Sequence, residues 1–187
     1  MKKDKIKNVL ENYRKQAQHT QSKIEEAKRL YQGDVAEREI SRLKSNLERE
    51  KATAASVIKE ITAAGRAEAK AWGEMDGEKI TADAKLLENN LLIPEQFPIF
   101  VEKYKDNGTM SQLLYNYGEK QNAERRAENP LAPPAFNTAL IASAETLVNN
   151  VDHIENSAMS ILDMVDGGFL GGANSEMVAA AIENFID

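Results

Sequence analysis

Residues that could do chemistry are few and scattered along this chain of 187 residues. The two histidines, His19 and His153, lie far apart in sequence, and neither belongs to a metal-ligand spacing such as His-Glu-x-x-His. Asp152 and Glu155 flank His153, but side chains so close in sequence point around a helix and do not converge on one ion. The absence of cysteine excludes disulfides, thiolate metal sites and a cysteine nucleophile. We therefore expect no metal site and no cofactor.

The glycine-rich stretch 166–174 precedes a segment with a helical pattern, an order that phosphate-binding loops share. It lacks the Lys-Ser/Thr pair that ends a P-loop, and no Lys or Arg occurs after Arg126. The negative local charge also opposes phosphate binding. We interpret the stretch as a flexible connector with Phe169 and Leu170 packed inward.

Signatures of catalysis are missing as well. The chain has no Gly-x-Ser-x-Gly elbow, no dinucleotide-binding fingerprint and no paired nucleophile and base. Carboxylates are plentiful, but no spacing singles out a pair for acid–base work. The sequence therefore predicts a non-enzymatic protein, with an active site assembled from distant carboxylates as the opposing alternative.

The longest apolar pattern runs from Leu140 to Val165. Its apolar residues are spaced alternately four and three apart, which is typical of a helix packed along its whole length against other helices. We expect this helix to start near Ala135. Small residues at alternate positions and the lack of flanking opposite charges favour a bundle or protomer interface over a free-standing dimeric coiled coil. The interface candidates on this seam are Leu140, Leu147, Val151, Ile154 and Ile161.

The N-terminal third predicts two long charged helices, over 3–31 and 35–72, separated at Gly33. Asp34 followed by Glu37 resembles a capping box, with Asp34 as the N-cap. The two helices either fold back as a hairpin or continue as one kinked rod, and the sequence leaves both open. The interface candidates on the second helix are Ile40, Leu43, Leu47, Val57 and Ile61.

The middle of the chain holds all five prolines, between 94 and 134. Because proline disrupts helix interiors, we expect only shorter helices there: one over 80–89, one started by Pro94 and Pro98, and one over 110–126 capped by Thr109. Six of the eleven aromatic residues fall between 97 and 136, which predicts a compact core in this part. A last helix is expected over 176–186, capped by Ser175.

Together these patterns predict an all-α protein with an extended charged helical arm over 1–77 and a small helical bundle over 78–187. Charge is divided unevenly along the chain. Residues 1–126 hold 24 basic and 21 acidic side chains, a net of +3, and residues 127–187 hold nine acids and no Lys or Arg, a net of −9. One explanation of this uneven charge is that the basic and acidic side chains lie on separate solvated faces. The other is electrostatic attraction between the basic N-terminal part and the acidic C-terminal part, within one chain or between copies.

The first 30 residues carry nine basic and four acidic side chains, a net of +5. Such a helix could contact nucleic-acid phosphates, and a nucleic-acid-binding or regulatory adaptor is the alternative function. It lacks a dense arginine cluster and interleaved aromatic residues, so the sequence does not favour a nucleic-acid partner. No apolar run approaches the roughly 20 residues of a membrane span, and no apolar segment follows the basic N-terminus as in a secretory signal.

Two stretches resemble a known class of proteins. One is 31–40, which opens the long charged helix, and the other is 86–117, with an apolar pair before Pro94-Glu-x-Phe97, a Tyr-Lys-Asp turn, and Thr109-Met-x-x-Leu-Leu114. This order is similar to small helical proteins encoded in the head-structure modules of tailed phages and prophages of Gram-positive bacteria. The likeness covers about residues 31–120, with Gly108 where the pattern has a proline and Pro98 as an additional interruption.

The resemblance implies a scaffold-like or capsid-associated structural protein that acts through helix-mediated self-association. It implies a homo-oligomer, a phage capsid or portal protein as partner, and a place in the host cytoplasm during assembly or in the virion. A transient scaffold and a permanent virion component both remain open. The resemblance transfers no catalytic residue.

Overall fold

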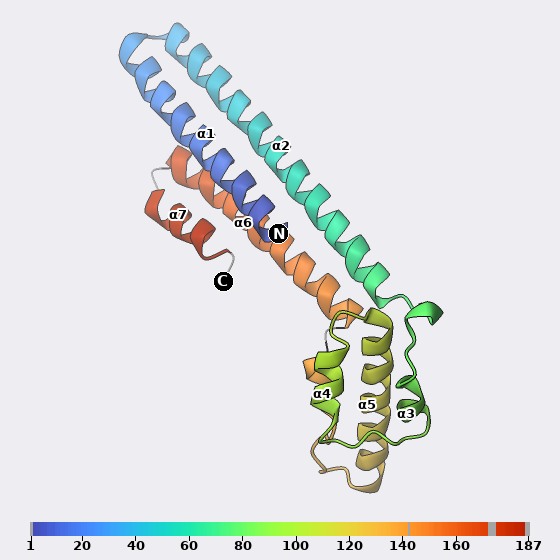
Figure 1. Cartoon of the computed structure of the whole chain (residues 1–187). Coiled ribbons are helices and arrows are strands. Elements are labelled where there is room, and N and C mark those ends of the chain that lie inside the picture. Colours follow the sequence, from blue (N-terminus) through green and yellow to red (C-terminus); the bar gives the residue numbers. More distant parts are fainter. Residues whose placement is uncertain (1, 142, 172–174, 186–187) are drawn as a thin grey trace. The chain divides into compact units, whose positions relative to one another are not determined.

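The computed structural model describes residues 2–141, 143–171 and 175–185, and every regular element among them is a helix (Figure 1). This confirms the expected all-α class. The α-helices are α1 (Lys2–Leu30), α2 (Asp34–Gly73), α3 (Ala84–Glu88), α4 (Phe97–Lys103), α5 (Gly108–Glu128), α6 (Ala144–Gly171) and α7 (Ser175–Glu183), and the 3₁₀ helices are η1 (Gly77–Lys79) and η2 (Thr138–Leu140).

The chain divides into two compact units, residues 1–65 with 151–187 and residues 66–150. This differs from the expected division between 77 and 78. The reason is that the C-terminal part of α6, together with α7, shares a core with α1 and α2. The N-terminal helices are therefore one side of a bundle, and the two ends of the sequence fold together.

In the first unit α1 and α2 form a hairpin and lie side by side (Figure 1). Gly33 makes the reversal possible because its φ of +57° is a conformation that residues with a side chain rarely adopt. Its carbonyl oxygen accepts the backbone N–H of Glu37 at 3.3 Å, so α2 begins at Asp34 itself. The residue before the first helical residue is therefore Gly33, and the expectation that Asp34 is the N-cap is wrong. Of the two arrangements left open by the sequence, the chain adopts the hairpin and not the kinked rod.

The core of the first unit joins four helices. Leu10, Ile58 and Leu162 are fully buried. Burying an aliphatic side chain of this size contributes about 2 kcal/mol, so this core stabilises the hairpin along much of its length. The buried members are Ile6, Leu10, Tyr13 and Ala17 of α1, Leu47, Ala54 and Ile58 of α2, Ala158, Ile161, Leu162 and Val165 of α6, and Val178 and Ile182 of α7.

The second unit is built around α5 and an aromatic cluster. The rings of Phe97 and Tyr117 each meet Phe136 edge-on, with centroid distances of 5.3 and 5.4 Å. Asn122 ties the segment before η2 to α5, because its Nδ2 donates to the Phe136 carbonyl at 2.7 Å and its Oδ1 accepts the Phe136 N–H at 3.0 Å. The core expected between 97 and 136 is therefore confirmed.

Several expected boundaries in the second unit are wrong. Asn107 is the N-cap of α5 in place of Thr109, and its Oδ1 accepts the Met110 N–H at 3.1 Å. Thr109 is buried, and its hydroxyl accepts the Asp76 N–H at 3.0 Å, so it fastens the segment after α2 onto α5. The helix expected over 80–89 is confined to α3 and preceded by η1.

The helix expected from about Ala135 begins only at Ala144. Two local interactions account for the late start. The Asn122 side chain holds the backbone of Phe136 in a non-helical segment, and Ser143 Oγ accepts the Thr146 N–H at 3.0 Å, as in an N-cap.

At its other end α6 continues past Val165 to Gly171, so the first part of the expected glycine-rich connector is helical. Residues 172–174 and the side chains of Phe169 and Leu170 lie outside the described part of the chain. The expected last helix is confirmed as α7; it includes Ser175 and ends at Glu183, and Ile186 lies outside the described residues.

Candidate interaction surfaces

Most of the predicted interface residues face the inside of the first unit. Leu43, Leu47 and Ile161 are buried, and Ile61 and Ile154 pack against the core from its edge. Ile40, Val57 and Val151 are partly buried. Because most of these side chains contact other helices of the same chain, these seams primarily hold the bundle together.

The other two candidates lie in the second unit. Leu140 is 51% exposed in η2, and Leu147 is partly buried in the first turns of α6. Leu140 and Ile141 line an open groove of about 630 Å³ together with Tyr115 and Thr146. The seam from Leu140 to Val165 is therefore interrupted, and Leu140 does not belong to the same helix face as Ile161.

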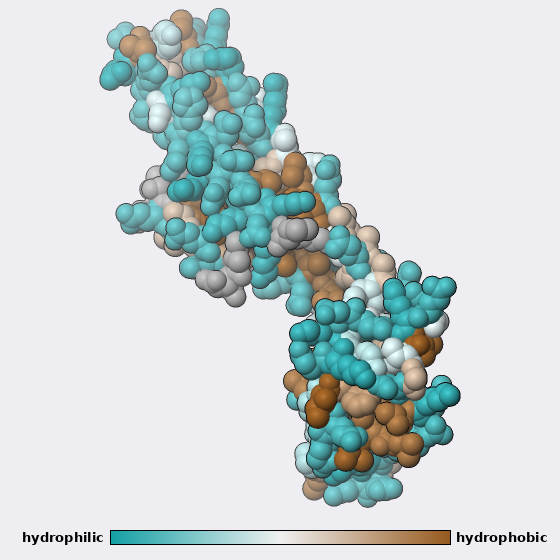
Figure 2. All heavy atoms as spheres, viewed as in Figure 1, coloured by the Kyte–Doolittle hydropathy of each residue, from teal (hydrophilic) through white to brown (hydrophobic). Residues whose placement is uncertain are grey.

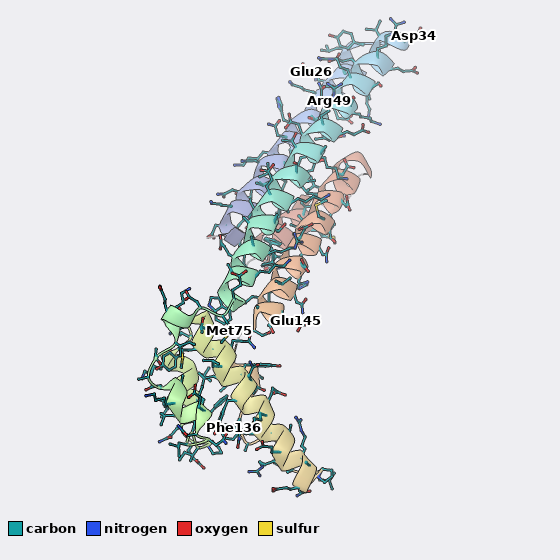
Figure 3. The ribbon with its side chains drawn as sticks, turned by 90° about the vertical axis from the view of Figure 1, so that its right-hand side faces the viewer. Glu26, Asp34, Arg49, Met75, Phe136 and Glu145 are labelled. Carbon is teal, nitrogen blue, oxygen red and sulfur yellow. The ribbon has the colours of Figure 1, made fainter. Side chains whose placement is uncertain are left out.

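The hairpin tip, defined by Leu30, Tyr31 and Val35, leaves apolar side chains uncovered. These three residues are 59%, 45% and 58% exposed. Figure 1 shows α1 and α2 extending beyond the ends of α6 and α7, and Figure 3 shows Asp34 at this end of the hairpin. The tip is exposed because the turn reverses the chain where no other described helix of the unit covers it.

A shallow cleft of about 360 Å³ lies beside the hairpin tip, lined by Tyr31, Val35, Arg38, Glu39 and Arg42. The Arg42 guanidinium donates to both Glu39 carboxylate oxygens, at 2.8 and 2.5 Å. These hydrogen bonds, together with the positive charge of Arg42, lower the pKa of Glu39. The cleft thus combines apolar side chains with an internally neutralised ion pair.

A second uncovered surface lies in the second unit, in a groove of about 300 Å³ between α3 and α5, which we call the α3–α5 groove. Figure 2 shows hydrophobic atoms gathered over this part of the unit. Ala84 and Leu87 form one wall, and Leu113 and Tyr117 form the other. The remaining lining residues are Ile80, Glu88, Asn90, Asn116 and Lys120.

Apolar residues that line the α3–α5 groove or follow its lining residues in sequence are also exposed. Ile80, Leu91 and Ile93 are 45%, 61% and 50% exposed. The sequence did not predict this surface, because an apolar residue in a short loop segment carries no period that separates a core position from an exposed one. The available signal was the apolar run Leu91-Leu92-Ile93 before Pro94, which marks apolar side chains outside a helix but does not tell which of them is exposed.

A polar cluster in the first unit links α2 to α6. The Lys51 ammonium lies 2.9 Å from Asp163 and 3.1 Å from Asp166. Burial lowers the pKa of Lys51, but the hydrogen bonds and charges of the two aspartates outweigh it and leave the pKa raised. Burial, followed by the charge of Asp166, raises the pKa of Tyr13. The cluster keeps Lys51 charged and pairs the N-terminal part of the chain with the acidic C-terminal part.

A second polar cluster lies beside α3. Asp83 accepts hydrogen bonds from Lys103 Nζ at 2.6 Å and from the Tyr104 hydroxyl at 2.7 Å. Thr81 extends the network, with its hydroxyl 2.9 Å from that of Tyr104. These hydrogen bonds join the end of α4 to the segment at the start of α3, so the arrangement explains local structure.

Neither histidine lies in such a cluster: His19 and His153 are both exposed. His153 lines a groove of about 530 Å³ with Lys3, Ser157 and Asn184. Within the described ranges, no group of three or more His, Cys, Asp or Glu side chains is placed to hold a metal ion. None of the helices formed by those residues is long and apolar enough to cross a membrane.

Comparisons of the chain with protein-family models, with curated proteins and with solved structures found no match.

Proposed function

We propose that this chain is a non-enzymatic structural or assembly protein of a tailed phage or prophage, and that it acts by binding other proteins through exposed helical surfaces. One observation supports this most directly. The two stretches that resemble phage head-module proteins, 31–40 and 86–117, contain Tyr31 and Val35 of the hairpin tip and most of the α3–α5 groove. The resemblance and the uncovered apolar surface therefore coincide.

Contiguous apolar surface is costly to leave in water. Exposed apolar patches bordered by polar residues commonly mark protein–protein contacts. Both surfaces here have charged borders, with Arg38 and Glu39 at the tip and Glu88 and Lys120 at the groove. The proposed partners are a second copy of the chain and a capsid or portal protein, encountered in the host cytoplasm during assembly or in the virion.

Co-expression with the major capsid and portal proteins of the same phage or prophage tests this proposal. We expect the chain to co-sediment with one of them, or to change the size of the particles that form. The double variant Tyr31→Asp, Val35→Asp should weaken this association, whereas Leu131→Asp, at a side chain that is 93% exposed elsewhere in the chain, should not. No co-sedimentation, unchanged particles and a strictly monomeric chain would together contradict the proposal.

The competing function is a nucleic-acid-binding or regulatory adaptor that uses residues 1–30. It is favoured by the exposure of Lys5, Lys15 and Lys23 along α1. Phosphate contacts release counterions, so such binding would weaken steeply with salt. Salt-dependent retention of DNA or RNA that is lost in a Lys5→Gln, Lys15→Gln, Lys23→Gln variant would support the adaptor and oppose the assembly function.

A further inference from the structure

We propose that the α3–α5 groove is a self-association site, in which two copies of the chain pack about a two-fold axis and each inserts Leu91 into the groove of the other. This inference rests on the proposed function and specifies one of its partners, a second copy. It is carried by three features of the second unit: an exposed apolar side chain on a backbone held by hydrogen bonds, a groove lined by the residues just before it in sequence, and two opposite charges that line this groove.

Leu91 is held by the end of α3. Asn90 adopts a φ of +52°, the Asn90 N–H donates to the Leu87 carbonyl at 3.1 Å, and the Leu91 N–H donates to the Leu86 carbonyl at 2.8 Å. This pair of bonds is the Schellman motif, in which the residue at the position of Leu91 commonly contacts the preceding helix turn. Here the Leu91 side chain is instead 61% exposed.

A fixed backbone with a free apolar side chain is suited to binding. The chain has already lost the conformational entropy of ordering this segment in the folded monomer, so less is lost on association. Two residues that line the groove, Glu88 and Asn90, come directly before Leu91 in the sequence. The groove and the exposed side chain of Leu91 therefore belong to the same short segment. A two-fold contact requires this proximity, since each copy must offer both the inserted side chain and the groove in one patch.

The charges at the groove also match a two-fold contact. Glu88 and Lys120 line the same groove and carry opposite charges. Among the described residues Glu88 has no ion-pair partner, and Lys120 has only a long contact of 3.9 Å to Glu124. When two copies are related by the proposed two-fold axis, Glu88 of each copy faces Lys120 of the other, so the contact contains two such ion pairs. Like charges at those positions would oppose association.

Charge reversal gives a test that depends on this geometry, with sedimentation velocity of the full chain across a range of concentrations as the measurement. Glu88→Lys alone and Lys120→Glu alone should each weaken the dimer by about tenfold or more, because each places two pairs of like charges in contact. An equimolar mixture of the two variants should dimerise again, and so should the double variant carrying both changes.

Two sets of controls separate the contact from general effects. Glu95→Lys and Arg126→Glu reverse exposed charges elsewhere in the same unit and should leave the dimer unchanged. Leu91→Asp should abolish association, whereas Leu131→Asp should not. Circular dichroism of each variant verifies the helical fold.

Three outcomes would overturn the inference. One is a wild-type chain that remains monomeric; if it still co-sediments with a capsid or portal protein, the proposed function stands without this contact. Another is an oligomer that none of the groove variants affects, which places self-association elsewhere. The third is a mixture of the two single variants that fails to recover while the wild type dimerises, which excludes the reciprocal pairing.

Discussion

Thr62 of α2 donates a hydrogen bond of 2.5 Å from its hydroxyl to the carboxylate of Glu155 on α6. The two residues are 93 positions apart in sequence, and Thr62 is 2% exposed. The hydroxyl also lies 3.1 Å from the carbonyl oxygens of Ile58 and Lys59, so three acceptors surround one donor. This contact joins the N-terminal and C-terminal parts of the sequence inside one bundle.

Replacing Thr62 with valine should therefore destabilise the first unit. The substitution keeps the shape of the side chain but leaves the carboxylate of Glu155 without the Thr62 donor, at a cost of about 1–3 kcal/mol in the free energy of unfolding. Chemical denaturation followed by circular dichroism measures the effect. Thr53→Val is the matched control, because the exposed Thr53 hydroxyl bonds only the Arg49 carbonyl of its own helix. Equal stability of the two variants would contradict this role for Thr62.

Asn122 should be equally sensitive in the second unit. In Asn122→Asp the Nδ2 donor to the Phe136 carbonyl is lost, and a carboxylate oxygen then faces that carbonyl at a site where Asn122 is 3% exposed. We expect a loss of about 1–3 kcal/mol in unfolding free energy, with weaker near-ultraviolet dichroism from the aromatic cluster. Asn137→Asp, at an exposed position nearby, should change neither signal.

Local sequence signals predicted the long helices well. Gly33 and Gly73 mark the two ends of α2: the helix begins directly after Gly33 and ends at Gly73, within one residue of the expected range at either end. The aromatic residues from Phe97 to Phe136 gather in one core because rings of this size bury the most area per side chain. Such signals are carried by residues near one another in sequence, where a pattern can report them.

Long-range competition was not predictable in the same way. The apolar seam through Leu140 predicted a continuous helix, but Asn122 holds Phe136 and Ser143 caps α6, and neither interaction leaves a period in the sequence. The packing of residues 151–187 against residues 1–65 was not predictable either. It depends on which apolar helix faces contact each other in the folded chain, and each face alone gives the same sequence pattern with any partner. The α3–α5 groove was not predictable because the exposure of Leu91 depends on which other segments pack over it in the folded chain, and no local pattern reports this.

The turn of the hairpin should tolerate only residues suited to positive φ. Gly33→Ala should destabilise the first unit by about 1–2 kcal/mol, since a Cβ is unfavourable in the left-handed conformation even where space is open. Gly33→Asn should cost less, because asparagine visits this conformation more readily. Gly77→Ala is the control, as Gly77 also has open space but no positive φ. Thermal unfolding should rank Gly33→Ala below Gly33→Asn, and a reversed ranking would exclude backbone strain as the cause.

Asp83 should make the stability of the second unit depend on pH. The hydrogen bond from Lys103, then that from Tyr104, lowers the pKa of Asp83 below its ordinary value of 3.8. A carboxyl group whose pKa is lower in the folded state than in the unfolded chain binds protons more weakly when folded. Its contribution to stability is therefore complete above the unfolded-state pKa and is lost as the pH falls through the folded-state pKa.

Asp83→Asn isolates this contribution, because the amide cannot ionise at any of these pH values. The variant should be less stable than the wild type at pH 7, and the difference should shrink as the pH is lowered towards 3, where the wild-type carboxylate begins to be protonated and its ion pair with Lys103 weakens. Urea denaturation at a series of pH values measures the difference, with Asp106→Asn at an exposed position as the control. A destabilisation of the same size at pH 7 and pH 3 would show that Asp83 acts through packing or neutral hydrogen bonds, and the charge of its carboxylate would then carry no part of the stability.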